Sequence, residues 1–315
     1  IMSMIDCYEP DFVRLFLSRH PDSALRVNLC WKTEVRQSLV LTDPASCQAA
    51  LGAPNTFVLH HSKCAANPDS PALSPRDQVL NQSALHTITL PGLSPELRLY
   101  ALGIMLSFSE KCPGDSEAVL EKLASLPQIL AGHVQEGKLQ EQFAQLPSLP
   151  QLQRELITRM GSCEFNWDLL PESTRKLTLP LQVSLLMLQD ANSEAMLQQQ
   201  LQDQWLQTWE RHFAQEAWIF SNYLIYRLYH DTFPQHKSES TLQRFFWLAA
   251  DVFMIRTLFC LWTMDDSALN HDEIYALFAL FEAWRNSESA HSLRQHILDM
   301  LPGDPLLSAF SLITR

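Results

Sequence analysis

Glycine is scarce in this sequence, with only eight glycines in 315 residues, where average usage of about 7% would give roughly 22. No two of them form a G-x-G pair. Glycine-rich turns are what allow a backbone to approach a phosphate in P-loops and dinucleotide-binding folds. The segment Gly132–Leu139 has phosphate-loop spacing, but it ends in Leu139, where magnesium binding needs a hydroxyl. The sequence therefore argues against a doubly wound nucleotide-binding domain.

Clustered cysteines are also missing. The seven cysteines contain no C-x-x-C pair, and the closest two are 17 residues apart, which predicts reduced thiols and no metal site. His60, His61 and Cys64 fall in a proline-bordered segment, for which we expect an ordinary surface loop. Residues 1–4 show no basic segment leading into an apolar run, the start of a secretion signal. Together these features predict a cytoplasmic protein.

Positive charge is in deficit, with 23 Lys and Arg against 35 Asp and Glu, a net charge of −12. Such a surface disfavours nucleic acid and anionic membranes as partners. The longest apolar segment, 245–264, is long enough to span a bilayer but contains Asp251 and Arg256, each costly at mid-membrane. We therefore expect no membrane insertion, and a buried core helix at this place.

The patterns that the sequence does contain are mainly those of helices. Residues 1–92 form a mixed N-terminal region with loops and short strands, predicted at 26–31, 35–41 and 86–90. From residue 93 to 315 we predict one all-helical domain. It opens with Ser94, Pro95 and Glu96, a cap followed by a first-turn proline and acid. Further predicted helices are a long one over 193–231 and four near 240–264, 270–286, 289–300 and 304–313. The expected fold class is mainly α.

One helical segment is unusually rich in hydroxyls. Residues 218–234 carry three tyrosines and an arginine among apolar residues. Tyr223, Tyr226 and Arg227 occupy neighbouring helical positions, and Tyr229 with His230 follows one turn after Tyr226. This face either lines a pocket for a methylene stem with a polar tip, or packs in the core with its hydroxyls hydrogen-bonded.

The pair Asp251 and Arg256 is the other polar feature of an apolar helix. Five residues apart, the two side chains point about 140° apart around the helix, so each is expected to meet a partner in another element. Charges in such a place are either paired for structure or positioned for function.

Four segments together resemble the flagellin lysine N-methylase family. Glu9–Phe16 (EPDFVRLF) is similar to the family's EPxFVxxF, and Thr33–Leu41 (TEVRQSLVL) resembles its EVRxSLxL strand. Ser94–Leu106 (SPELRLYALGIML) has the texture of its first core helix. Asn222–Tyr229 (NYLIYRLY), with Phe233-Pro234, resembles its carboxy-terminal signature. The segments occur in the family's order along most of the chain.

The resemblance implies methyl transfer from S-adenosylmethionine to flagellin lysines, and an iron–sulfur cluster held by a cysteine-rich stretch. Here the stretch after Phe16, residues 17–22, has no cysteine, and Asp43-Pro44 stands where the family has Cys-Pro. No cluster ligand carries over, and Cys47 is a weak substitute. Either this homologue has lost the cluster, or a cysteine-rich segment is missing from the chain between Phe16 and Arg26.

A lysine amine must lose its proton before it attacks a methyl donor, so a polar route needs a base or desolvation nearby. A cluster-dependent radical route would need the missing cysteines instead. By this reasoning the predicted catalytic residues are Tyr223, Tyr226, Tyr229 and Asp251. The predicted substrate-binding residues are Asn222, Arg227, His230 and Arg256. The alternative is a non-catalytic helical module that binds a flagellar or other secreted protein.

Overall fold

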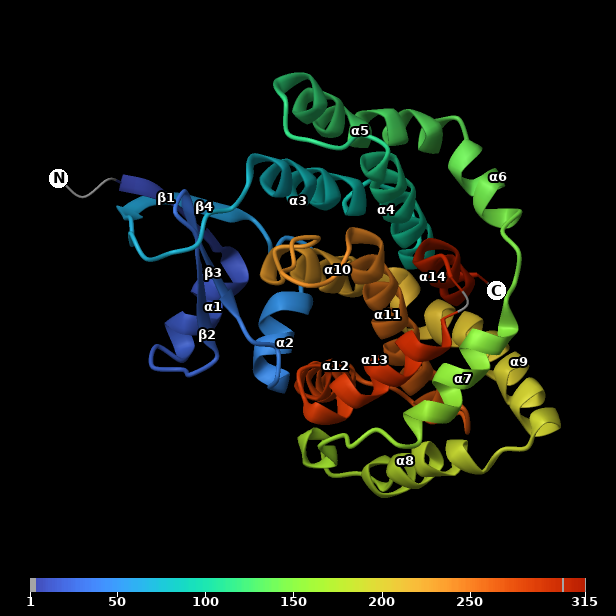
Figure 1. The fold of residues 1–315 in the computed structure, drawn as a ribbon. Helices are drawn as coiled ribbons and strands as arrows, with labels where there is room; N and C mark the ends of the chain where they lie inside the picture. The colour runs from blue at the N-terminus through green and yellow to red at the C-terminus, as the bar shows by residue number, and fades with distance from the viewer. Residues whose placement is uncertain (1–3, 302, 315) are drawn as a thin grey trace. The chain divides into compact units, whose positions relative to one another are not determined.

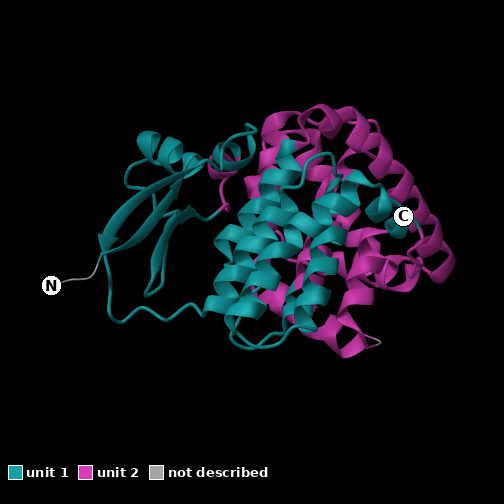
Figure 2. Cartoon of the chain, turned by 90° about the horizontal axis from the view of Figure 1, so that it is seen from above, with its two compact units in different colours: residues 1–40, 48–144, 218–244 teal, residues 41–47, 145–217, 245–315 magenta. Residues whose placement is uncertain are grey.

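The computed structural model describes residues 4–301 and 303–314, and its chain divides into two compact units (Figure 2). Unit 1 comprises residues 1–40, 48–144 and 218–244, and unit 2 comprises 41–47, 145–217 and 245–315. The boundary predicted after residue 92 therefore falls inside unit 1. Residues 1–3, on which the expectation about a secretion signal partly rests, lie outside the described residues.

Unit 1 contains a four-stranded sheet of order β2-β3-β1-β4 (Figure 1). Its strands are β1 (Met4–Pro10), β2 (Arg26–Cys30), β3 (Glu34–Leu39) and β4 (Leu59–Ala65). β1 is parallel to β3, whereas the β2–β3 and β1–β4 pairs are antiparallel. The two strands predicted at 26–31 and 35–41 are thus confirmed.

The segment expected to be a surface loop around His60 is instead strand β4. Its residues pair with β1 over the whole length of that strand, from Met4↔Ala65 to Pro10↔Leu59. The partners are about fifty residues away along the chain, so local spacing gave no signal. In this register His61 lies next to Asp6, with 2.6 Å between Nε2 and Oδ1, and His60 contacts Asp11.

Unit 1 also contains helices, of which α1 (Asp11–Arg19) packs on β1 and β3. The others are α3 (Pro75–Ile88), α4 (Pro95–Glu110), α5 (Glu117–Gln135), α6 (Lys138–Ala144) and α10 (Trp218–His230); α2 (Pro44–Leu51) enters the unit at residue 48. α3 packs on α4, α5 and α10. The phosphate-loop-like segment lies at the end of α5 and the start of α6, with a turn at Glu136 and Gly137 between the two helices.

The strand predicted at 86–90 is wrong, because these residues end helix α3. Ser74 caps that helix by accepting from the amide of Asp77, and Pro75 occupies its first turn. Thr87 and Ile88 are fully buried, so tertiary packing overrides their β-branched preference. The start predicted for α4 is confirmed: Ser94 accepts from the amide of Leu97.

Unit 2 is built from helices around two almost wholly buried ones, α11 (Thr241–Thr263, of which 245–263 belong to the unit) and α12 (His271–Arg285). The others are α7 (Pro150–Met160), α8 (Thr174–Leu185), α9 (Ala191–Thr208), α13 (Glu288–Met300) and α14 (Pro305–Ile313). The most apolar 18-residue window of α11 is entirely buried, which confirms a core helix there. All four predicted C-terminal helices are present.

The long helix predicted over 193–231 is interrupted. α9 ends at Thr208, a π-helical turn covers Trp209–Phe213, and a short 3-10 turn precedes α10. The π turn positions Phe213 fully buried against Phe259, with 5.0 Å between ring centroids. Aromatic packing therefore breaks a helix whose apolar periodicity is continuous in the sequence.

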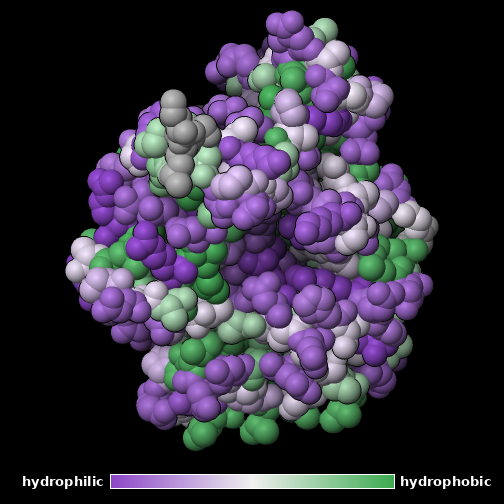
Figure 3. All heavy atoms as spheres, turned by 60° about the vertical axis from the view of Figure 1, so that its left-hand side comes forward, coloured by the Kyte–Doolittle hydropathy of each residue, from purple (hydrophilic) through white to green (hydrophobic). Residues whose placement is uncertain are grey.

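Apolar side chains are not all buried. On the face shown in Figure 3 they occur in separate groups among hydrophilic residues. In unit 2, α8 and the turn after it carry three of them, with Leu177 at 73%, Leu181 at 64% and Leu188 at 76% exposure. Together the units form a mainly α protein with one small sheet, as predicted.

Candidate functional site: a buried polar network on β3 and α10

Three polar residues alternate along β3 on the face that is turned away from solvent. Glu34, Arg36 and Ser38 are at most 7% exposed, and they share one face because side chains alternate along a strand. The Arg36 guanidinium donates from Nε to Glu34 Oε1 at 2.5 Å. Burying such a pair is tolerated only when further hydrogen bonds satisfy the remaining donors and acceptors.

Asn81 of α3 supplies those further bonds and extends the network to α10. Its Oδ1 accepts from Arg36 at 2.8 Å, and its Nδ2 donates to the carbonyls of Leu228 and Phe233 at 2.9 and 2.7 Å. The Leu228 carbonyl lies in the last turn of α10 and also accepts from the amide of Phe233 at 3.0 Å, while Phe233 itself lies beyond the end of the helix. One buried amide thus joins β3, α3 and the end of α10.

The predicted tyrosines complete this network through their hydroxyls. Tyr226 donates to the carbonyl of Leu39 at 3.0 Å, and Tyr229 donates to that of Gln37 at 3.1 Å. Next to them, His230 Nδ1 lies 2.8 Å from Ser38 Oγ, and its ring stacks on Tyr226 with 4.8 Å between centroids. Hydrogen bonds therefore hold the last turn of α10 against residues 37–39 of β3. We call Glu34, Arg36, Ser38, Asn81, Tyr226, Tyr229 and His230 the β3–α10 network.

Tyr223, Arg227 and Asn222 are the other predicted site residues on α10. Arg227 donates to the hydroxyl of Tyr223 at 3.1 Å and pairs with Asp231 at the same distance. Asn222 faces another segment, where its Nδ2 donates to the carbonyl of Ala53 at 2.7 Å. All three side chains are buried.

Burial decides the chemistry of the tyrosine hydroxyls. Tyr223 and Tyr226 are 0% exposed and Tyr229 is 4% exposed. Burial raises the pKa of Tyr229, and this outweighs the lowering effect of the nearby Arg36 guanidinium, which lies over the ring at 5.5 Å. The hydroxyl of Tyr229 is therefore protonated at neutral pH and acts as a donor. His230, which is half-buried, is the one predicted α10 residue with appreciable exposure.

Asp251 and Arg256 belong to unit 2, and each contacts another helix there, as their spacing predicts. Asp251, buried in α11, is paired with Arg294 of α13 at 3.4 Å. The Arg256 guanidinium lies over the ring of Trp205 in α9 at 5.5 Å from the centroid. The predicted site residues thus fall into six on α10 and two on α11.

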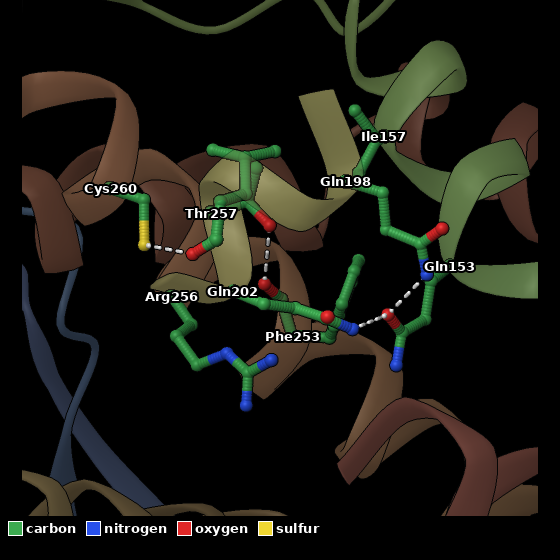
Figure 4. Close-up of a pocket in the computed structure, with 9 residues that line it drawn as sticks. Gln153, Ile157, Gln198, Gln202, Phe253, Arg256, Thr257 and Cys260 are labelled. Carbon is green, nitrogen blue, oxygen red and sulfur yellow. Dashed lines mark hydrogen bonds between the residues drawn. The ribbon is translucent and has the colours of Figure 1, made fainter. Parts of the chain in front are cut away.

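A small cavity borders Arg256 (Figure 4). Its polar wall contains Gln153, whose Oε1 accepts from the amides of Gln198 at 2.9 Å and Gln202 at 3.2 Å. The volume of about 10 Å³ matches about one water molecule. This cavity has room for a structural water and not for a methyl donor or a lysine side chain.

Sequence reasoning missed Glu34, Arg36, Ser38 and Asn81 as members of the site. Glu34, Arg36 and Ser38 lie within Thr33–Leu41, one of the segments that resemble the family. The signal that could have identified them is a polar residue at every second position of a strand. Asn81 gave no signal, because its three partners lie 45 to 152 residues away along the chain.

The cysteines do not fit an iron–sulfur cluster. Cys7 pairs in register with Val35 and Ser62, and Cys30 also pairs with Val35, so Cys7, Cys30 and Cys64 share one sheet face. Burial, followed by the neighbouring Cys7, raises the pKa of Cys64. Yet within residues 4–301 and 303–314, no group of three or more His, Cys, Asp or Glu is arranged to hold a metal ion. We therefore derive no chemical step through a cluster.

Comparison with known proteins shows which family the chain belongs to. The structure is that of a mainly α protein. Strand β3 and helix α10, which lie in two of the segments that resemble the lysine N-methylase family, are hydrogen-bonded to one another. A family model described as the FliB lysine N-methylase C-terminal domain matches residues 81–301. The chain belongs to this family.

Two curated relatives cover nearly the whole chain. Both are named lysine-N-methylase. The one from Salmonella choleraesuis (strain SC-B67) is 24% identical over 301 residues, which are 92% of this chain and 74% of the relative. The one from Salmonella typhimurium (strain LT2) is 23% identical with the same coverage. No solved structure matches.

Proposed function

We propose that this protein is a cytoplasmic protein-lysine N-methyltransferase that acts on flagellin, with S-adenosylmethionine as methyl donor. The observation that carries the proposal is the family match, which spans residues 81–301 and includes all of α10. It is supported by the β3–α10 network, in which segments about 190 residues apart form specific buried hydrogen bonds.

The chemistry requires a neutral lysine amine. Its nitrogen lone pair attacks the donor methyl carbon, the carbon–sulfur bond breaks, and the sulfur keeps the bonding electrons as a neutral thioether. The ammonium proton must leave first, and a base of pKa near 7 suits this task. In our proposal His230 accepts that proton, because it is half-buried whereas Tyr223, Tyr226 and Tyr229 are at most 4% exposed. Ser38 holds its ring through Nδ1.

The other predicted roles are open to the same experiments. The geometry supports Tyr226 and Tyr229 as positioning residues that hold α10 on β3, since their hydroxyls donate to backbone carbonyls. Catalytic roles for Tyr223 and Asp251, and substrate-binding roles for Asn222, Arg227 and Arg256, remain predictions.

The test is co-expression of flagellin with the protein, followed by intact-mass measurement of flagellin. We expect mass increments of whole methyl groups with the wild-type protein. His230→Gln should abolish them while retaining the fold, and His236→Gln is the matched control outside the network. Flagellin that co-purifies with the protein but gains no mass would favour the non-catalytic binding module, and would refute the proposal.

A further inference from the structure

A groove in unit 1 remains outside the β3–α10 network. Its volume is about 510 Å³, within the range of about 300–1,000 Å³ usual for small-molecule sites. One wall is α1 and the other is the segment 53–56. The lining residues are Asp11, Phe12, Arg14, Leu15, Ser18, Ala53, Pro54, Asn55 and Thr56.

The two walls are fixed to one another by backbone hydrogen bonds. The amides of Asp11 and Phe12 donate to the carbonyls of Val58 and Thr56, each at 2.9 Å. Phe12 is fully buried and packs on Phe57, with ring centroids 4.8 Å apart. The groove is therefore formed before any ligand binds, which lowers the entropy cost of binding.

Asn222 of α10 forms hydrogen bonds with the segment 53–56, which is the second wall of the groove. Its Nδ2 donates to the carbonyl of Ala53 at 2.7 Å and to Thr56 Oγ1 at 3.1 Å, and Thr56 in turn donates to the carbonyl of Ala50. Asn222 was predicted to bind substrate. These hydrogen bonds hold in place the segment that lines this groove, and a role of Asn222 in substrate binding stays a prediction.

The groove offers both signs of charge beside apolar surface. Asp11 and Arg14 lie three residues apart on α1, with side chains 46% and 54% exposed. Their present partners are His60 and Glu9, and such exposed ion pairs contribute little, so ligand groups can replace them. Leu15 and Pro54, both exposed, provide the apolar part.

We propose that this groove binds S-adenosylmethionine, an inference that rests on the proposed function. The donor has an α-amino acid end, which is a zwitterion, a positively charged sulfonium, and a ribose that carries a flat adenine base. Arg14 would take the carboxylate with its planar pair of N–H donors, and Asp11 would face the ammonium. A lysine side chain of a protein substrate carries only positive charge and gains nothing from Arg14. The charge pair therefore favours the donor.

Calorimetric titration of the full-length protein tests the assignment. S-adenosylmethionine should bind wild type, and Arg14→Gln should weaken binding about tenfold or more, as expected for loss of a charge-assisted hydrogen bond. Methylthioadenosine, which lacks the amino acid end, should bind wild type and Arg14→Gln equally. Arg19→Gln, on the same helix but outside the lining, is the matched control and should bind like wild type.

A second variant blocks the groove without removing charge. Ala53 is exposed and its carbonyl, not its side chain, bonds to Asn222, so Ala53→Trp should fold and abolish binding of both ligands. Unchanged donor affinity in both Arg14→Gln and Ala53→Trp would overturn the assignment. If those variants still bind donor and still methylate flagellin, only the groove is refuted. If wild type neither binds donor nor methylates, the proposed function fails as well.

A change in the kinetics toward flagellin alone, caused by Arg14→Gln, would also overturn the assignment. In that case the KM for flagellin rises while donor affinity stays unchanged, and the groove belongs to the protein substrate.

Discussion

At the scale of single residues, unit 1 contains a buried ion pair between Glu34 and Arg36. Arg36 is 7% exposed and Glu34 is 5% exposed, and Arg36 also donates to Asn81. Removing one member of such a pair leaves an uncompensated buried charge, whereas removing both leaves none.

We expect Arg36→Met to lower the free energy of unfolding by about 3–5 kcal/mol, because Glu34 loses its buried partner. The double variant Arg36→Met with Glu34→Gln should recover a large part of that loss. Arg26→Gln, in the exposed part of β2, should change it by less than about 0.5 kcal/mol. Urea titration measures all three, and equal losses for Arg36→Met and Arg26→Gln would contradict the network.

The tyrosine hydroxyls lead to a second prediction. Tyr226→Phe removes the hydrogen bond to the Leu39 carbonyl and should cost about 0.5–1.5 kcal/mol of stability, while kcat for methyl transfer stays close to wild type. A hydroxyl that takes part in proton transfer would instead lower kcat by roughly 10²-fold or more. Thermal unfolding and single-turnover methylation separate the two roles.

Thiol reactivity provides a third test at this scale. Burial raises the pKa of Cys260 to about 12, whereas Cys30 is exposed. Because the thiolate is the reactive form, iodoacetamide at about pH 8 should label Cys30 readily and leave Cys260 unmodified in the native protein. Since the folded pKa lies above the ordinary 9.0, this thiol's contribution to stability is complete below about pH 9 and is lost as the pH rises toward 12. Peptide mass spectrometry reads the labelling, and rapid native labelling of Cys260 would contradict the packing.

At the scale of elements, the sequence predicts features that depend on neighbouring residues, and it misses features that depend on pairing between distant segments. Ser94, followed by Pro95, marks the start of α4 correctly, because a cap and a first-turn proline act within one helical turn. Strands β1 and β4 escaped prediction because their pairing joins Met4–Pro10 to residues 49 to 61 positions away along the chain. The strand expected at 86–90 failed for the same reason, since the packing of α3 is decided by distant helices.

The candidate site follows the same division. Helical spacing alone placed Tyr223 beside Arg227 and Tyr226 beside His230, and the structure has both contacts. It also implied that Asp251 meets another helix. It could not reveal Asn81, whose partners come from two other segments, and it could not distinguish a pocket from a packed face.

The cap of α4 allows a prediction at this scale. Ser94→Ala should cost about 1 kcal/mol, since the amide of Leu97 loses its acceptor. Ser125→Ala is a matched control, because the Ser125 hydroxyl is exposed and only bonds within its own helix. Equal effects of the two substitutions in urea unfolding would show that the cap contributes nothing.

At the scale of the whole molecule, the scarcity of glycine constrains how a donor binds. A helix such as α1 with an adjoining segment, 53–56, can provide charge and apolar surface without a glycine-rich turn. If the donor binds the folded chain, a concentration about 100 times its Kd should raise the free energy of unfolding by about 2.7 kcal/mol. Thermal unfolding with and without S-adenosylmethionine checks this, and Ala53→Trp should show no increase.

The most direct test of lysine methylation uses purified components. Flagellin is incubated with the protein and methyl-labelled S-adenosylmethionine, then hydrolysed and analysed for Nε-methyl-lysine. We predict label in methyl-lysine with wild type and with Arg19→Gln, and none with His230→Gln. Absence of labelled methyl-lysine with the wild-type protein, when the same preparation binds both donor and flagellin, would contradict the account.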